Sequence, residues 1–116
     1  MRRAPRHWLL SAVAGLYLSS AHAPAMATDD PLFAIKLSEG RFEPAQVPVP
    51  ASTAFKVTVT NAGTAPIEFE SFELHRERVV QPGETITVNM PSLAPGTYQF
   101  FDDFHADTPA GAIIVK

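Results

Sequence analysis

Short segments in which apolar and polar residues alternate, separated by proline and glycine, run from residue 32 to the end of the chain. Residues 32–44, LFAIKLSEGRFEP, alternate Phe33, Ile35 and Leu37 with polar neighbours. Residues 54–61, AFKVTVTN, follow the same pattern and lead into the turn segment NAGTAP. A period of two is that of a β-strand with one buried face. No segment after residue 27 sustains a helical period with caps, so an all-β fold is predicted.

The later segments repeat this design. RERVVQPGETITVNM, residues 76–90, reads as two strands joined by a Pro-Gly turn; another Pro-Gly pair precedes GTYQFFD, and AGAIIVK supplies a last strand. About seven strands in under ninety residues predict one domain, residues 28–116, with an antiparallel Greek-key β-sandwich fold. The connections 39–53 and 104–111 are expected to be loops, and loops are where a site is usually carried.

The N-terminal segment, residues 1–27, has the layout of a secretory signal peptide. Three arginines among the first six residues precede an apolar run over residues 8–18, and small residues follow it. The run is shorter than the roughly 20 residues that span a bilayer. Pro24 directly after Ala23 disfavours cleavage there, so cleavage after Ala27 and a periplasmic location are predicted. An uncleaved membrane anchor, the alternative, would leave the same domain outside the membrane.

Charge and composition restrict the chemistry of the exported part. The predicted signal peptide holds three of the nine basic residues, so six basic residues face twelve acidic ones and the formal net charge is −6. This balance argues against nucleic-acid binding and is compatible with cations. The chain has no cysteine, which excludes thiol catalysis, iron-sulfur clusters and cysteine zinc sites. The sequence also has no Ser-His-Asp, glycine-rich or HExxH motif of the kinds found in enzymes. The protein is therefore not expected to be an enzyme.

Two motifs resemble those of the cupredoxins. The pattern G-x-Y-x-F-x-D-x-x-H from Gly96 to His105, followed by GAIIV, resembles the C-terminal cupredoxin signature, in which a copper-binding cysteine stands at the position of Asp102. More narrowly, EFESFELHRERVVQPGETITV with PGTYQFFDDFH is similar to the EfeO-type cupredoxin-like domains of bacterial periplasmic proteins. The resemblance covers the whole chain after residue 27. It implies a cupredoxin-like fold and a link to iron or copper acquisition.

The departures from the cupredoxin pattern concern the metal ligands. Asp102 replaces the cysteine, Pro109 stands near the place of the axial methionine, and Ile67 or Glu68 falls at the first histidine position. Only His105 matches. A type 1 blue copper site needs the cysteine thiolate, so that cofactor is not expected.

An oxygen-rich metal site is predicted instead. On a strand that starts at Gly96, Asp102 shares a face with Phe100, so its carboxylate is expected at the rim of the core. Glu68 and Glu70 also share a face and could point at the same rim. Hard or borderline cations, iron or copper above all, suit such ligands. The predicted function is metal binding that assists uptake, with a membrane iron or copper permease or another periplasmic metal protein as partner. The predicted ligands are Glu68, Asp102, His105, Glu70 and Asp103.

Other interpretations of these residues stay open. The aspartates could bind backbone N–H groups at a turn, the glutamates could form a solvated strand face, and His105 could bond to a loop carbonyl. The protein would then be a metal-free interaction module. A redox or electron-transfer role is a further alternative.

Several other side chains carry expectations. His75 is expected to be exposed, with a possible second site beside Glu73. Phe101 and Phe104 are expected in the core rather than in a collar around the site, and Met90 is expected to fill the core.

Overall fold

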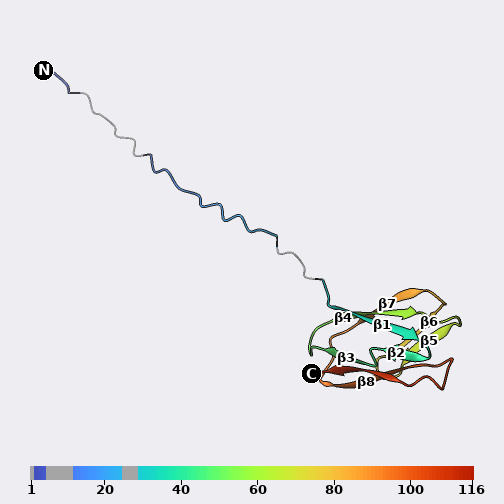
Figure 1. Ribbon diagram of the computed structural model, residues 1–116. Coiled ribbons are helices and arrows are strands. Elements are labelled where there is room, and N and C mark those ends of the chain that lie inside the picture. Colours follow the sequence, from blue (N-terminus) through green and yellow to red (C-terminus); the bar gives the residue numbers. More distant parts are fainter. Residues whose placement is uncertain (1, 5–11, 25–28) are drawn as a thin grey trace.

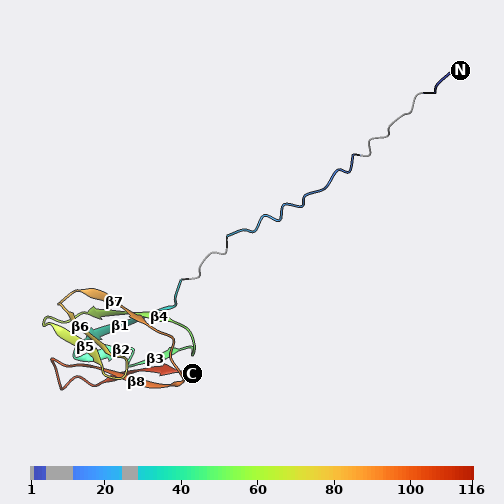
Figure 2. The same cartoon turned by 180° about the vertical axis from the view of Figure 1, so that it is seen from behind.

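The computed structural model describes residues 2–4, 12–24 and 29–116. Residues 32–115 form two β-sheets that pack face to face, as two opposite views show (Figures 1 and 2), and no helix occurs among the described residues. The four-stranded sheet has the order β2 (Arg41–Glu43), β1 (Leu32–Ser38), β4 (Phe55–Asn61) and β7 (Thr85–Met90); the five-stranded sheet has the order β3 (Gln46–Val49), β9 (Gly111–Val115), β8 (Gly96–Asp102), β5 (Ile67–Ser71) and β6 (Arg76–Val80).

The predicted all-β sandwich is confirmed, with two features that the alternation did not reveal. First, β1 pairs with β4 and β3 pairs with β9 in parallel, whereas the other neighbours are antiparallel. Second, β2 and β3 lie within residues 39–53, where a loop was expected. That expectation was wrong because Phe42, Val47 and Val49 are buried, and two short strands let this connection bury them against both sheets.

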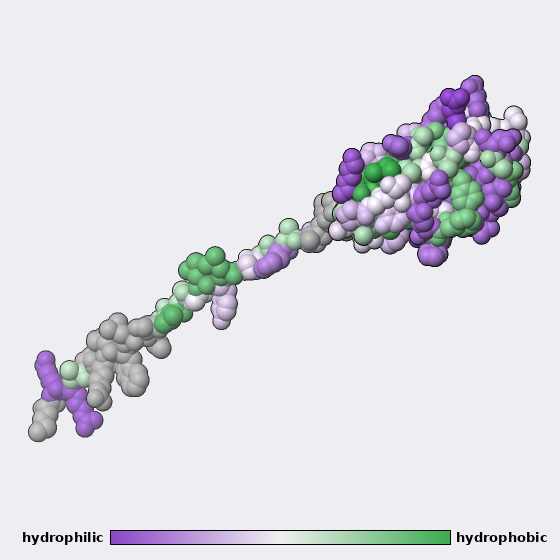
Figure 3. Space-filling model, turned by 90° about the horizontal axis from the view of Figure 1, so that it is seen from below, coloured by the Kyte–Doolittle hydropathy of each residue, from purple (hydrophilic) through white to green (hydrophobic). Residues whose placement is uncertain are grey.

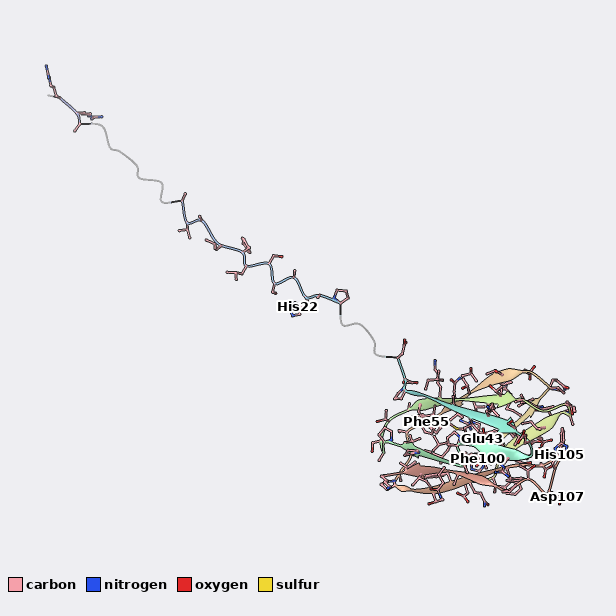
Figure 4. All side chains as sticks on the ribbon, in the orientation of Figure 1. His22, Glu43, Phe55, Phe100, His105 and Asp107 are labelled. Atoms are coloured by element: carbon pink, nitrogen blue, oxygen red, sulfur yellow. The ribbon has the colours of Figure 1, made fainter. Side chains whose placement is uncertain are left out.

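The core lies between the sheets and is built on phenylalanines. Phe100 of β8 is fully buried, and its ring meets Phe42 edge to face with 5.0 Å between centroids. Phe69 of β5 lies on another side of the same ring at 5.3 Å. Figure 4 shows Phe55 and Phe100 inside the sandwich. The predicted burial of Met90 is confirmed, and Phe55 and Phe100 are buried as well.

Two aromatic residues near the end of β8 are not in the core. Phe101 is half-buried and the side chain of Phe104 is 49% exposed, so the expectation of core burial was wrong. Phe101 follows the inward-facing Phe100 and therefore points to the outside of the sheet. Phe104 lies on the loop after β8. His75, in contrast, is exposed as predicted, in the turn between β5 and β6.

The described part of the N-terminal segment has neither helix nor strand. Residues 12–24 run away from the sandwich as extended chain (Figure 1), and the apolar residues Leu16 and Leu18 are almost fully exposed. Figure 3 shows green, apolar side chains along this segment. Among the residues described, no helix has the length and apolar character needed to span a bilayer. The predicted cleavage position after Ala27 and part of the apolar run lie outside the described residues.

Candidate metal centre

Strand β5 presents different side chains to the two sides of the five-stranded sheet. Ile67 and Phe69 are buried in the core; Glu68 and Glu70, between and beyond them, therefore face outward. Glu70 is paired with Glu77 of β6 and with Phe101 of β8. Because directly paired residues lie on the same face, the outer side of these three strands carries carboxylates from neighbouring strands.

Three of these carboxylates come together. Glu68, Glu70 and Asp103 offer ligand atoms that all lie within 4.8 Å of one another, and we call these residues the acidic cluster. Asp103 reaches it because its backbone N–H donates to the carbonyl oxygen of Glu68 over 3.0 Å, which continues the β5–β8 ladder beyond the last residue of β8. Oxygens on opposite sides of one hard cation are roughly 4–5 Å apart, so the spacing suits a single ion.

The electrostatics of the cluster favour a bound cation. A hydrogen bond with Glu77, burial, and the charges of Glu77, Asp103 and Glu70 raise the pKa of Glu68 to about 7. Burial, followed by the charges of Asp103 and Glu77, also raises the pKa of Glu70, which a hydrogen bond with Glu68 partly opposes. Crowded carboxylates repel one another unless a proton or a cation neutralises them. Near neutral pH, Glu68 therefore retains a proton for part of the time.

Basic side chains do not neutralise this cluster in the described part of the chain. The ion pairs found there are Lys36 with Glu43, at 3.8 Å, and His105 with Asp102, and neither includes a cluster residue. Glu77, which adjoins Glu68 and Glu70, was not among the predicted ligands. The register of the β5–β6 hairpin could have revealed it, because Ser71 pairs with Arg76 and thereby sets Glu77 opposite Glu70.

Asp102 lies on the other side of the same sheet. It pairs with the core residue Phe69, and its side chain is completely buried rather than at the rim. Its Oδ1 accepts hydrogen bonds from the backbone N–H groups of Glu68, at 3.0 Å, and Phe104, at 3.1 Å. Its Oδ2 accepts a hydrogen bond from Nδ1 of His105 at 2.7 Å. Both oxygens are thus occupied by protein donors.

His105 stands at the end of the sandwich, as Figure 4 shows together with Asp107. Its side chain is 43% exposed, and with Asp102 it lines a pocket of about 510 Å³. Asn61, the last residue of β4, and Thr64, from the turn that follows it, also line this pocket. Asn61 is fully buried and holds the turn by donating to the carbonyl oxygens of Ala65 and Val80.

The five predicted ligands therefore fall into two groups instead of surrounding one pocket. Glu68, Glu70 and Asp103 meet on the outer face of the five-stranded sheet, whereas Asp102 and His105 meet on its inner side and at the end of the sandwich. The shared rim expected for Glu68 and Asp102 is absent because adjacent strand residues alternate between faces, and Phe69, not Glu68, is the partner of Asp102.

The possible second site around His75 can also be located. His75 lines a smaller pocket, of about 410 Å³, with Glu70, Phe72 and Glu77. Glu73 is not part of this lining. The pocket lies beside the acidic cluster, with which it shares Glu70, and its outer wall includes the exposed ring of Phe72.

Comparisons with known proteins agree with this fold. An uncharacterised protein of Rickettsia prowazekii (strain Madrid E) is 40% identical over 102 residues, covering 87% of this chain and 82% of its own length. A purple cupredoxin from Nitrosopumilus maritimus has a TM-score of 0.56 at 18% identity, covering 72% of this chain and 99% of its own. The metal-binding domain of the Cu(I)-exporting P-type ATPase CopA of Streptococcus pneumoniae has a TM-score of 0.63 at 13% identity, covering 78% of this chain and 91% of its own. The model of the cupredoxin-like domain matches residues 8–115, and this chain belongs to the cupredoxin-like domain family.

Proposed function

We propose that this protein is exported to the periplasm, binds one iron ion at the acidic cluster and supplies it to a membrane uptake system. The observation that carries the proposal is the convergence of three carboxylates, from Glu68, Glu70 and Asp103, within 4.8 Å on one face of the sheet. Folding brings these like charges together with no basic partner among the described ion pairs. A bound cation would offset the repulsion among these carboxylates, because each of them would be attracted to the ion.

The chemistry of the ligands favours iron over copper. All three are carboxylates, which are hard donors, whereas soft thiolate or thioether ligands select Cu(I). The copper of a blue cupredoxin does not fit this chain, because there is no cysteine and the carboxylate of Asp102 at that position already accepts three hydrogen bonds. Cupric ion at the acidic cluster is the alternative metal.

A role in delivery is supported by the surroundings of the cluster. Phe101 is paired with Glu70, and its ring contacts Phe72 edge to face at 5.1 Å. The side chain of Phe72 is 70% exposed and that of Val79, the partner of Glu68, is 45% exposed. Exposed aromatic and apolar groups are typical of protein contact surfaces. The same apolar surroundings would serve a metal-free interaction module, the second candidate function.

Metal titration of the purified protein tests the metal. Isothermal calorimetry with ferric citrate, ferrous ion under anaerobic conditions and cupric ion should give about one equivalent, with iron bound most tightly. The variants Glu68→Gln, Glu70→Gln and Asp103→Asn should each weaken binding at least about tenfold, because each removes one charged ligand. Glu73→Gln and Asp107→Asn remove nearby carboxylates outside the cluster and should bind as the unmodified protein does.

Other results would favour other functions. Equal affinity in the triple variant Glu68→Gln, Glu70→Gln, Asp103→Asn would remove the acidic cluster as the site. Absence of binding for all three metals would leave the interaction module. Cell fractionation after expression of the full chain tests export: a periplasmic protein that begins at Thr28 is expected, and a cytoplasmic full-length protein would contradict it.

A further inference from the structure

Asp102 combines three contacts that tie separate parts of the chain together. Its carboxylate accepts from the backbone of Glu68 on β5, from the backbone of Phe104 on the following loop, and from the ring of His105. The side chain is fully buried, so water does not compete for these bonds. Hydrogen bonds to a charged, buried acceptor are stronger than those between neutral groups.

The effect of these contacts falls on Glu68. Its N–H is bound by the side chain of Asp102 at 3.0 Å, and its carbonyl oxygen is bound by the N–H of Asp103, also at 3.0 Å. The backbone of one cluster residue is therefore held at both of its polar groups by residues 102 and 103. One of those holders, Asp103, is itself a cluster residue.

His105 contributes to the same arrangement from the other end. Its Nδ1 donates to Oδ2 of Asp102 over 2.7 Å, and its backbone N–H donates to the carbonyl oxygen of Asp102 over 3.2 Å. The ring thereby fixes the rotation of the Asp102 carboxyl group, so that Oδ1 stays directed at Glu68 and Phe104. The chain turns back at this point, as the N–H of Thr108 donates to the carbonyl oxygen of His105.

We propose that Asp102 and His105 form a latch that positions Glu68 against Asp103, and that neither residue is itself a ligand of the metal. This inference rests on the proposed function of the acidic cluster. It assigns to Asp102 and His105, both predicted as ligands from the sequence, the role of positioning residues. Partners that orient metal ligands typically affect affinity by about 10–100-fold when removed.

Paired substitutions at Asp102 distinguish a latch from a ligand. In Asp102→Asn the amide oxygen still accepts from Glu68 and Phe104, so iron affinity should stay within about threefold of that of the unmodified protein. In Asp102→Ala both acceptors are lost, and affinity should fall by about 10–100-fold. A ligand role predicts a loss in Asp102→Asn as large as that in Asp102→Ala, because the anionic oxygen is removed in both. Asp107→Asn, on the same loop, is the control.

Spectroscopy tests whether the imidazole of His105 coordinates the metal. Cupric ion serves as a probe at the acidic cluster, and pulsed electron paramagnetic resonance detects the nitrogen of a coordinated imidazole. We expect no imidazole nitrogen signal that depends on His105, and the same spectrum from the unmodified protein and from His105→Gln. An imidazole signal that disappears in His105→Gln would identify His105 as a ligand and overturn the latch.

A readout without metal separates this inference from the proposed function. Amide hydrogen exchange should be faster at Glu68 and Phe104 in Asp102→Ala, and unchanged in Asp102→Asn. If no metal binds to the unmodified protein, the proposed function fails while this exchange pattern still demonstrates the latch. Equal exchange rates at Glu68 in all three proteins would refute the latch even if metal binding is confirmed. Should Asp102→Ala not fold, a loss of more than tenfold in the folded Asp102→Asn is the refuting result.

Discussion

Glu68 is a strand residue on the outer face of a sheet, yet only 7% of its surface is exposed. Its pKa is raised to about 7 from 4.5, first by the hydrogen bond with Glu77 and then by burial and neighbouring charges. Between these two values the native protein holds a proton that the unfolded chain has released. The free energy of unfolding of the metal-free protein should therefore fall as pH rises from about 4.5 to about 7, with no further fall from this group above that range.

Urea denaturation in the presence of a chelator, at pH 5 and at pH 8, measures this pH dependence. Glu68→Gln removes the titrating group, so the decrease between the two pH values should be smaller in this variant than in the unmodified protein. Glu73→Gln is the matched control and should keep the full decrease. Identical decreases in all three proteins would show that the pKa of Glu68 is not raised in the native protein.

At the scale of strands, Gly111 of β9 pairs with the core residue Phe100 of β8. A Cβ atom at Gly111 would overlap the ring of Phe100 and lie 2.9 Å from the carbonyl oxygen of Ala45. Gly111→Ala should therefore lower the free energy of unfolding by about 1–3 kcal/mol, the usual cost of overpacking a core. Gly96→Ala, at the other end of the same strand pair, is the control, because its Cβ would meet only Tyr98, at 3.6 Å or more.

Thermal and urea denaturation of the two variants test this packing. A loss in Gly111→Ala with Gly96→Ala close to the unmodified protein is expected. Equal stability of Gly111→Ala and the unmodified protein would mean that the ring of Phe100 can move away from β9 without cost.

At the scale of the whole molecule, the sandwich and the metal are expected to stabilise each other. A ligand that binds only the folded state adds about 2.7 kcal/mol at a free concentration of 100 times its Kd. The Tm should therefore rise on addition of iron and return to its starting value with a chelator. The triple variant Glu68→Gln, Glu70→Gln, Asp103→Asn should show no rise, and a rise equal to that of the unmodified protein would place the ion elsewhere.

Much of the fold could be predicted from local sequence. Alternation identified the strand segments around Phe55, Phe100 and Met90 and the face of each that enters the core. It did not reveal β2 and β3, because three- and four-residue strands with prolines beside or within them give too short a pattern. It also gave no sign that β1 pairs with β4 in parallel, since the direction of a neighbour is not encoded in a strand's own period.

The sequence was sufficient to name the residues of the candidate site, but not to predict which of them lie together. Glu68, Glu70 and Asp103 were all named as ligands from the sequence, and the three meet in the structure. Asp102 was expected beside Glu68, and its carboxylate does accept a hydrogen bond from the backbone N–H of Glu68, but the two carboxylates lie on opposite faces of the sheet. Glu77 was not named, although hairpin register brings it to the cluster.

The amino-acid sequence by itself determined the class of fold, the inward and outward faces of the longer strands, and the exclusion of thiolate ligands, because each follows from local period or from composition. Only the tertiary structure decided which carboxylates share a face. That choice depends on the register between β5 and β8, which are some thirty residues apart, and a shift of one residue would exchange Asp102 and Asp103 between core and surface. Register is set by the packing of Phe69 against Phe100, and no short segment of the chain contains both.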